Sequence, residues 1–297
     1  MLRIEGLSKT YANGVHALAN LNLEVKPGLF GLLGPNGAGK SSLMRTIATL
    51  QPCDSGAIQF GAIDVLTQPE EIRKTLGYLP QDFEVYPQFS ALTMLNHFAA
   101  LKGIAKRGER RDAVQGLLAM VNLWDVRHRK LGTYSGGMRQ RFGVAQALLG
   151  NPRLVIVDEP AAGLDPEERQ RMLNFLSEIG EHVVVILSTH LVEDVADLCR
   201  SMAILMNGSI VAGGEPERLI ASLHGRIWSA VLDRSQIKSY REQWDVLSAR
   251  LSAGRIALRI QSETSPGPAF RRVEANLSDV YFSVLNQNRR QDMARQG

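Results

Sequence analysis

The sequence predicts an α/β fold built on a parallel sheet. Three observations lead to this prediction. A glycine-rich loop, Gly34–Ser41, joins a short apolar run to a helix-like segment. A second apolar run ends in the acidic pair Asp158–Glu159, and a third ends just before His190. Short, almost continuous apolar runs are typical of parallel strands that are buried on both faces.

Residues 1–83 combine N-terminal strands, expected at Leu2–Leu7 and Leu21–Val25, with the phosphate-loop unit. In that unit Leu29–Leu33 fits a buried strand, and Ser41–Ala48 carries apolar residues along one side of a helix. Strand, loop and helix follow in the order that the GxxxxGK[ST] pattern requires. Main-chain N–H groups of the glycine loop and the helix N-terminus can then surround phosphate oxygens.

The loop and the acidic pair predict a nucleotide site. Lys40 is expected to hold the β- and γ-phosphates, and the Ser41 hydroxyl to ligate Mg²⁺. Asp158 and Glu159 follow the apolar run Leu154–Val157, at the sheet edge where ligands bind in open α/β folds. Asp158 is expected to hold the water shell of Mg²⁺. Glu159 is expected to orient and polarise the attacking water, either as general base or as an electrostatic positioner.

Residues 84–150 are predicted to be mostly helical, because apolar residues recur at helical spacing in Met94–Lys102, Asp112–Asn122 and Ser135–Leu149. Residues 151–214 return to the alternation of strand and helix that a parallel sheet requires. The last helix of the insert begins at a Ser-Gly-Gly turn, where its N-terminus can meet an anion from outside the domain.

Taken in order, these motifs resemble those of the ATP-binding cassette (ABC) ATPases, the nucleotide-binding subunits of membrane transporters. The matching positions are Tyr11, Gly34–Ser41, Gln81, Tyr134–Gln140, Asp158–Glu159, Ala161–Pro166 and Ser188–His190. The resemblance covers residues 1 to about 214. It implies a P-loop NTPase of ABC type, with a parallel-sheet core, an N-terminal antiparallel β subdomain and a helical insert at about 84–150.

The resemblance also implies ATP and Mg²⁺ as cofactors and assigns roles to side chains. Tyr11 would stack on adenine, Gln81 would touch Mg²⁺ and sense the γ-phosphate, and His190 would reach the γ-phosphate. The implied catalytic residues are Glu159, His190 and Gln81, and the implied metal ligands are Ser41, Gln81 and Asp158. The implied nucleotide contacts are Tyr11, Gly34, Pro35, Asn36, Gly37, Ala38, Gly39, Lys40, Ser41, Ser42, Ser135, Gly136, Gly137 and Asp165.

Two parts of the chain depart from the family's commonest pattern. In the signature, Tyr134 and Met138 stand where Leu and Gln are usual, and after the acidic pair Ala161 stands where Thr or Ser is usual. The serine and glycines of the signature, which contact phosphate in this family, are all present. We therefore expect Met138 to alter local packing and the chain to remain an active ATPase.

By resemblance, two copies pair head to tail, and each ATP lies between Gly39–Lys40 of one copy and Ser135–Gly137 of the other. Hydrolysis removes the γ-phosphate and loosens this clamp. The expected partners are a second cassette and a separate polytopic membrane subunit, with no nucleic acid. The protein is then expected to be peripheral, on the cytoplasmic face of the inner membrane.

A surface for the membrane subunit is expected just past Gln81, in Asp82–Phe89. Exposed Phe83, Tyr86 and Phe89 beside acidic residues would suit a short helix of that subunit. The alternative is that these aromatic side chains fill the insert's own core.

Two classes of function remain open. The first is a transporter ATPase, with export favoured by the resemblance of the signature and of the C-terminal extension to exporter cassettes. The second is an ABC ATPase that acts on ribosomes or DNA without a membrane subunit. That class generally has two cassettes or a long coiled coil before the signature, whereas here one cassette has 53 residues between Gln81 and Ser135. The core also lacks a basic stripe with interleaved aromatics.

Composition fits a protein of a reducing compartment. Of 297 residues only Cys53 and Cys199 are cysteines, so no disulfide framework is expected. No apolar run approaches the roughly 20 residues of a membrane span, and the N-terminus is predicted to be a strand, not a signal peptide. The remaining histidines show no metal-binding spacing.

Residues 215–297 are predicted to form a small α+β accessory extension. Its expected elements are a helix from Glu215–Ile220, alternating segments at Ile227–Leu232 and Ile256–Ile260, a loop at Ser262–Pro268 and a capped amphipathic helix at Asn276–Phe282. Similar extensions occur on bacterial exporter cassettes. The alternative is an appendage for stability or dimerisation.

The positive charge of the chain lies in this extension. Residues 1–214 contain 21 basic and 21 acidic residues, whereas residues 215–297 contain 13 and 9, which accounts for the net charge of +4. Arg289, Arg290 and Arg295 form a basic tail. Such a tail is attracted to an anionic membrane leaflet or to acidic partner loops, but a solvated disordered end is the expectation we favour for the last ten residues.

Overall fold

The structure, a computed structural model, describes residues 1–252 and 254–296 of the chain. It divides into two compact units, Met1–Ile210 and Val211–Gly297. The division falls inside strand β10 (Ser209–Gly214), and the boundary predicted from the sequence lies at the end of the same strand.

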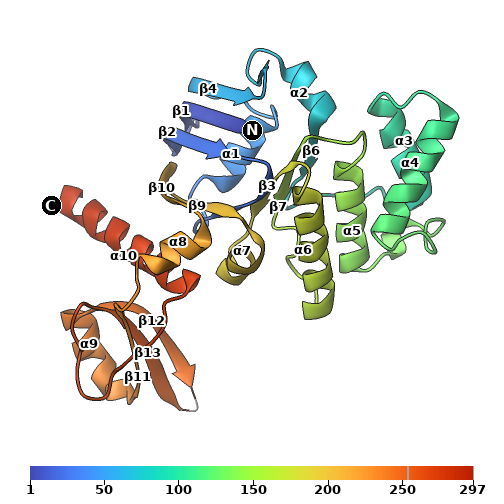
Figure 1. Cartoon of the computed structure of the whole chain (residues 1–297). Helices are drawn as coiled ribbons and strands as arrows, with labels where there is room; N and C mark the ends of the chain where they lie inside the picture. Colours follow the sequence, from blue (N-terminus) through green and yellow to red (C-terminus); the bar gives the residue numbers. More distant parts are fainter. Residues whose placement is uncertain (253, 297) are drawn as a thin grey trace. The chain divides into compact units, whose positions relative to one another are not determined.

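A six-stranded sheet forms the centre of the first unit (Figure 1), with the strand order β10-β9-β3-β8-β7-β6. The strands beside β10 are β3 (Gly28–Leu33), β6 (Leu76–Leu79), β7 (Leu154–Asp158), β8 (Val184–Ser188) and β9 (Ser201–Met206). Neighbours from β9 to β6 pair in parallel, and every residue of β3, β7 and β8 is buried. The predicted parallel-sheet core is confirmed.

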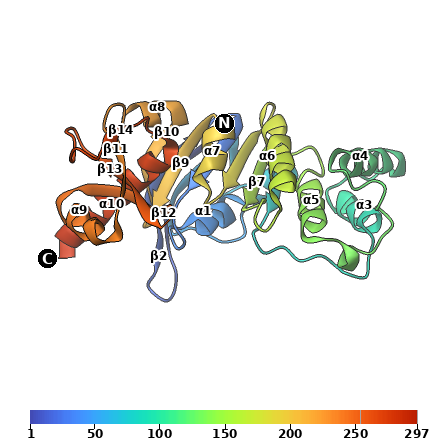
Figure 2. The same ribbon diagram turned by 90° about the horizontal axis from the view of Figure 1, so that it is seen from below.

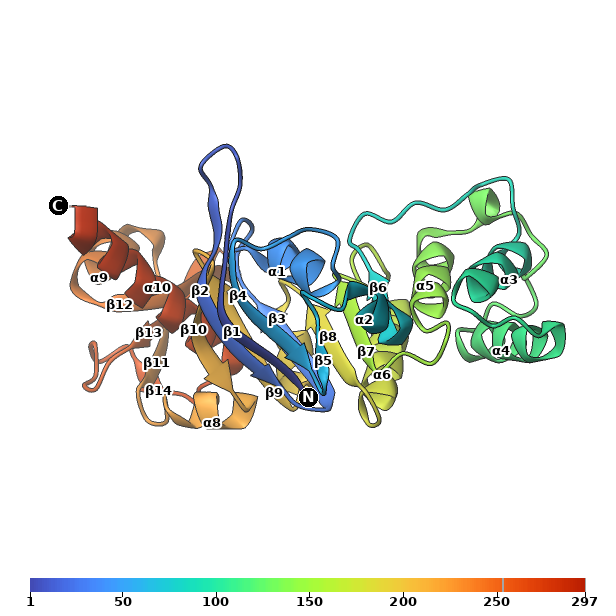
Figure 3. The ribbon, with the colours of Figure 1, turned by 90° about the horizontal axis from the view of Figure 1, so that it is seen from above.

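A second, antiparallel sheet is built from the N-terminal region, as predicted. Its order is β2-β1-β4-β5, and its strands are β1 (Leu2–Thr10), β2 (His16–Val25), β4 (Ser55–Phe60) and β5 (Ile63–Asp64). Figure 3 shows these strands on the side of the central sheet that carries α1 (Lys40–Ile47). Leu43 and Met44 of α1 are fully buried in an apolar core that both sheets share, which holds α1 at the end of β3.

Helices cover the opposite face of the central sheet. α6 (Pro166–Gly180) packs on β3 and β8, and α7 (Val192–Leu198) packs on β3. Gly31 permits this approach, because a Cβ there would lie 2.6 Å from Val195 of α7. In the chain α6 follows β7 and α7 follows β8, and each helix packs back against the sheet.

The predicted helical insert is present (Figure 2). It has its own apolar core. After α2 (Pro69–Thr75) and β6, it contains α3 (Ala91–Leu101), α4 (Arg107–Met120), a 3₁₀ turn at Leu131–Thr133 and α5 (Gly136–Ala147). Ser90 and Ser135 begin α3 and α5 as N-caps, each side chain accepting a hydrogen bond from the N–H three residues later. The serine of the predicted signature therefore starts a helix.

The second unit contains a four-stranded antiparallel sheet in the order β12-β13-β11-β14. Its elements are α8 (Pro216–Ala221), β11 (Ile227–Leu232), a 3₁₀ turn at Arg234–Gln236, α9 (Ile237–Gln243), β12 (Asp245–Ser252), β13 (Arg255–Gln261), β14 (Arg271–Arg272) and α10 (Leu277–Gln296). The two predicted strands are β11 and β13, while β12 and α9 were not foreseen.

The last helix is longer than predicted. Asn276 and Asp279 exchange hydrogen bonds with each other's main chain at its start, as a capping pair. The buried Asp279 also pairs with Arg259 of β13 at 2.6 and 2.8 Å. The helix continues to Gln296, so the expected disordered end was wrong for residues 288–296, because a run rich in Arg, Gln, Met and Ala has high helix propensity.

The basic tail therefore begins on a helix. Arg290 pairs with Asp245 of β12 at 3.1 Å, while the side chain of Arg295 lies outside the described residues. Among the helices that the structure describes, none is long and apolar enough to cross a membrane.

The two cysteines, both free, should differ in reactivity. Burial raises the pKa of the Cys199 thiol to about 12, so almost no thiolate, the reactive form, exists at pH 8. Cys53 is only partly buried. We expect a disulfide reagent such as DTNB to titrate one thiol per native chain and two after unfolding. Cys53→Ser should abolish the fast reaction, and two fast thiols in the native protein would contradict the described burial.

Candidate nucleotide-binding site

Three parallel strands end at one edge of the central sheet. In the register of the sheet Leu32 of β3 pairs with Ser188 of β8, and Ser188 pairs with Asp158 of β7. The residues that follow these strands therefore emerge side by side. They are the glycine-rich loop after β3, Glu159 after β7 and His190 after β8.

The glycine-rich loop is shaped by close main-chain packing. Gly37 and Gly39 have φ values of 80° and 108°, in the left-handed region that glycine adopts at little cost. A Cβ on Gly39 would lie 2.3 Å from the carbonyl oxygen of Ala17. The loop can therefore turn its N–H groups inward only with glycine at this position.

Lys40 lies at the start of α1 and is 7% exposed. Its Nζ donates hydrogen bonds to the carbonyl oxygens of Gly34 at 2.6 Å and Pro35 at 3.1 Å. Burial lowers the pKa of Lys40, and the charges of Glu159 and Asp158 oppose this shift. The protein's own main chain thus holds a charged amine beneath the loop.

Asp158 is 3% exposed and accepts a hydrogen bond from Ser41 Oγ at 3.1 Å. Burial raises the pKa of the Asp158 carboxyl, while the hydrogen bond from Ser41 opposes the shift. The contact brings a hydroxyl of the loop-to-helix unit against the carboxylate of β7. These are the two side chains that the sequence assigned to a metal, together with Gln81.

Glu159 has an unusual backbone. Its φ is 50°, a left-handed conformation that costs a non-glycine residue roughly 1–2 kcal/mol. Its N–H donates to the Ser188 carbonyl oxygen at 2.9 Å, which fixes the turn. Its Oε1 lies 3.2 Å from Nδ1 of His190. Two of the three predicted catalytic side chains, Glu159 and His190, are therefore in contact within one chain.

A cavity of about 420 Å³ lies over the loop. Its lining is Tyr11, Val15, Ala17, Asn36, Gly37, Ala38, Gly39, Lys40, Ser41, Ser42, Gln81, Asp158 and Glu159. The Tyr11 hydroxyl is hydrogen-bonded with Ser42 Oγ at 2.9 Å and with Gln51 Oε1 at 3.0 Å. The structure thus gathers the predicted aromatic, loop, glutamine and acidic residues around one space. Val15, Ala17 and Gln51 belong to no short motif and were missed.

Six predicted nucleotide contacts do not line this cavity: Gly34, Pro35, Ser135, Gly136, Gly137 and Asp165. Ser135 and Gly137 are at the N-terminus of α5, and Gly136 lines a separate cavity of about 920 Å³ that also reaches Gln81. Asp165 instead caps α6, its Oδ1 accepting the N–H of Glu168 at 2.8 Å. A role in nucleotide binding stays a prediction for these six residues, as it does for those that line the cavity.

The unusual signature residues serve local packing. Tyr134 is 4% exposed, and its hydroxyl donates to the Val126 carbonyl oxygen at 3.0 Å. Met138 packs against the insert's core. Ala161 is also buried.

Comparison with known proteins agrees with this geometry. The sequence profile of the family described as ABC transporter matches residues 18–162. Over 227 residues the chain is 33% identical to the linearmycin resistance ATP-binding protein LnrL of Bacillus subtilis (strain 168), covering 76% of this chain and 72% of that protein. The chain belongs to the ABC transporter family. It is the ATP-binding, ATP-hydrolysing subunit of such a transporter.

Two further ABC proteins extend the comparison. The chain is 31% identical over 290 residues to the methionine import ATP-binding protein MetN of Bordetella pertussis, covering 94% of this chain and 78% of that protein. Among solved structures, the dimeric structure of MJ0796, described as a bacterial ABC transporter cassette, matches with a TM-score of 0.67 and 26% identity, over 72% of this chain and 98% of that one.

Removing the buried amine should weaken nucleotide binding by the ABC cassette. Lys40→Ala would remove the predicted charge-assisted contact to phosphate, worth about 1.5–3 kcal/mol, so we expect the Kd for ATP to rise about tenfold to a hundredfold. Equilibrium binding of a fluorescent ATP analogue measures this. Lys26→Ala, at an exposed position outside the cavity, is the matched control, and equal affinities for both variants would contradict the role of Lys40.

Proposed function

We propose that two copies of this chain close head to tail around ATP and that this closure powers export through a separate membrane subunit. One observation carries the proposal. The phosphate loop lines one cavity, whereas the signature residue Gly136 lines another. A signature helix that begins at a surface away from its own loop suits a site completed by a second copy. The dimeric form of the MJ0796 cassette supports this arrangement.

The signature turn has the groups that a partner's γ-phosphate needs. Ser135 Oγ accepts the N–H of Met138 at 3.2 Å, which leaves its own O–H to donate to phosphate. The N–H groups at the N-terminus of α5 and the helix dipole favour an anion in the same place. Ser135, Gly136 and Gly137 would therefore contact ATP held by the phosphate loop of the other copy.

The donor set of the site fits Mg²⁺. The hydroxyl of Ser41, the carboxylate of Asp158 and the side-chain amide of Gln81 present oxygen ligands, which Mg²⁺ prefers. When bound with ATP, Mg²⁺ neutralises charge on the phosphate oxygens. Ser41 would hold it directly, and Asp158 through its water shell.

The chain's own residues would then act on the phosphates and on water. Lys40 holds the β- and γ-phosphates, and Tyr11 stacks on the adenine. Glu159 orients and polarises the water that attacks the γ-phosphorus, as the bond to the leaving ADP oxygen breaks. His190 lies against the Glu159 carboxylate, where it can hold that group and contact the γ-phosphate.

The surface beyond Gln81 is proposed to dock the membrane subunit, and the three predicted aromatics divide between two roles. Phe83 packs against the insert's core, so this residue fits the alternative, in which the aromatic side chains fill that core. Tyr86 and Phe89 are 56% and 43% exposed and form an edge-to-face pair. With Glu84 they offer an apolar and acidic surface to a partner helix. Gln81 borders both cavities, which favours communication between the docking surface and ATP.

Export is the direction that we propose, at the cytoplasmic face of the inner membrane. The signature around Tyr134–Arg141 resembles those of exporter cassettes, and LnrL is named for linearmycin resistance. MetN, named for methionine import, is a relative over a longer stretch. The test is an affinity pull-down from detergent-solubilised membranes followed by substrate transport in vesicles. Recovery of one polytopic protein with outward transport supports the proposal, whereas inward transport or recovery of ribosomes contradicts it.

Glu159→Gln should separate ATP binding from hydrolysis. The amide keeps the shape of the side chain but loses the negative charge that polarises water, so we expect turnover to fall by about two to four orders of magnitude and ATP to stabilise the dimer. Phosphate release and analytical ultracentrifugation with ATP measure the two effects. A variant that stayed fast and monomeric would disprove the closure mechanism.

Charge reversal at the docking surface should uncouple ATP hydrolysis from transport. Glu84→Lys reverses an exposed charge beside Tyr86, while the cavity over the phosphate loop is untouched. We expect the ATPase rate of the isolated cassette to be unchanged and transport by the assembled system to fall severalfold. Glu181→Lys, at an exposed position in the turn before β8, is the control, and unchanged transport in Glu84→Lys would remove this surface from consideration.

A further inference from the structure

The first turn of α6 carries two ion pairs that reach different parts of the nucleotide machinery. Glu168 pairs with Arg141 of α5 at 3.2 Å, and its neighbour Arg169 pairs with Asp194 of α7. Neither pair is part of the cavity over the phosphate loop. Ion pairs between residues three or four apart stabilise a single helix, whereas these two pairs connect α6 to two other elements.

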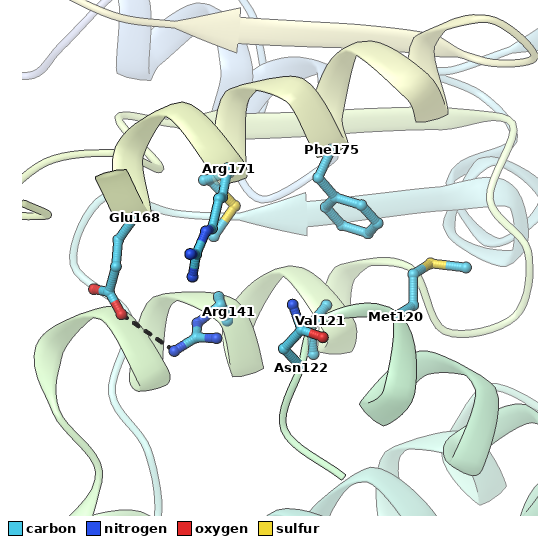
Figure 4. A pocket seen from close by; sticks show the side chains of 8 residues that line it. Met120, Val121, Asn122, Arg141, Glu168, Arg171 and Phe175 are labelled. Atoms are coloured by element: carbon cyan, nitrogen blue, oxygen red, sulfur yellow. Dashed lines mark hydrogen bonds and ion pairs between the residues drawn. The ribbon is translucent and has the colours of Figure 1, made fainter. Parts of the chain in front are cut away.

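The Glu168 pair holds the signature helix (Figure 4). Arg141 and Glu168 face each other across the gap between α5 and α6. Arg141 Nε also donates to the carbonyl oxygen of Gly137 at 3.4 Å. The Glu168 carboxylate packs so closely on Gly137 that a Cβ there would lie 1.8 Å from its Oε2. The side chain of Glu168 therefore lies directly against the signature glycine.

The Arg169 pair holds the loop that carries the switch histidine. Asp194 has a side chain that is only 7% exposed, and its Oδ2 accepts a hydrogen bond from Thr189 Oγ1 at 3.5 Å. Thr189 Oγ1 in turn accepts the N–H of Leu191 at 3.1 Å. These contacts lie on both sides of His190 in the sequence, so they restrict the main chain on which that side chain depends.

Both pairs start from the same turn of helix, the first turn of α6. Glu168 and Arg169 are adjacent, and the N–H of Glu168 is capped by Asp165 at 2.8 Å. The chain between Glu159 and Asp165 leads from the catalytic carboxylate straight into this turn. A displacement of the signature helix would therefore move the first turn of α6, and through it the main chain at His190 and Glu159.

We infer that Glu168 and Arg169 are positioning residues that couple the signature turn to the catalytic pair of the same chain. This inference rests on the proposed head-to-tail dimer. There, the signature of one copy contacts the ATP of the other, so the α6 turn connects the two ATP sites. Glu168 sets how well the signature closes on the partner's ATP, and Arg169 sets how well His190 and Glu159 are aligned in the chain's own site.

Substitutions of Glu168 and Arg169 should have different effects, the first on ATP-dependent dimerisation and the second on kcat. In a Glu159→Gln background, Glu168→Gln should raise the ATP concentration for half-maximal dimerisation about threefold to tenfold, since a partly exposed pair is lost. ATP binding by the monomer should be unchanged, because the phosphate loop is intact. With Glu159 restored, Arg169→Gln should lower kcat about tenfold with the half-maximal ATP concentration unchanged. Ultracentrifugation, equilibrium binding and steady-state kinetics measure these quantities.

Glu167→Gln is the matched control. Glu167 lies on the same turn but pairs with Arg171 of its own helix, so dimerisation and kcat should match those of the unsubstituted chain. A double-mutant cycle of Arg141→Gln with Glu168→Gln should be non-additive, the double variant resembling either single one. Additive effects would contradict the pair's role. If Glu168→Gln lowers the melting temperature, Arg141→Gln alone provides the same dimerisation test.

The outcomes separate the two proposals. If Glu159→Gln alone fails to dimerise with ATP, the head-to-tail mechanism fails. If it dimerises and Glu168→Gln behaves like Glu167→Gln, the mechanism stands and the positioning role of Glu168 is overturned. Equal losses of dimerisation and kcat in Glu168→Gln and Arg169→Gln would show general destabilisation of α6 and would overturn the division of roles.

Discussion

The parallel register of β3, β8 and β7 is the constraint on which the site depends. Ser188 of the middle strand is paired on one side with Leu32 and on the other with Asp158. Because side chains alternate along a strand, a shift of one residue would turn a catalytic side chain to the other face of the sheet. The apolar residues buried on both faces of these strands therefore maintain the geometry of the chemistry as well as the stability of the fold.

The same geometry brings charged groups of opposite sign close together. Two carboxylates, Asp158 and Glu159, approach a single buried amine, that of Lys40. Burial opposes ionisation of both Lys40 and Asp158, as their shifted pKa values indicate. A triphosphate adds further negative charge, so a cation bound with it relieves the repulsion. The strained backbone of Glu159 is retained in the same place, as is common where a side chain must be held for catalysis.

Short contiguous motifs made much of the site predictable. The loop, the acidic strand and the strand before His190 each combine an apolar run with polar residues at its end, so local sequence was sufficient. Contacts between distant segments were not predictable in this way. Gln51, which lies just past α1, contacts the Tyr11 hydroxyl only in the folded chain. Phe83 packs against the insert's core, whereas Tyr86, three residues later, is exposed.

The C-terminal unit was harder to predict for the same reason. β12 contains Asp245, Ser248 and Arg250 and has few fully buried positions, so it lacks the alternation that marks a strand. Its pairing with β13 supplies the stability that its own sequence does not show. The start of α10 is likewise fixed by a contact across the unit, that of Arg259 with Asp279.

The two carbonyl contacts of Lys40 have a consequence for the thermodynamics of nucleotide recognition. A free lysine side chain has about 1.5–2 kcal/mol of rotamer entropy to lose when it becomes ordered. Here Gly34 and Pro35 already restrict that freedom within the folded chain. The loss therefore belongs to folding, and in the proposed site ATP would meet a side chain whose rotamer is already selected. Tight recognition of a small, highly charged ligand then needs little ordering of the protein at the moment of encounter.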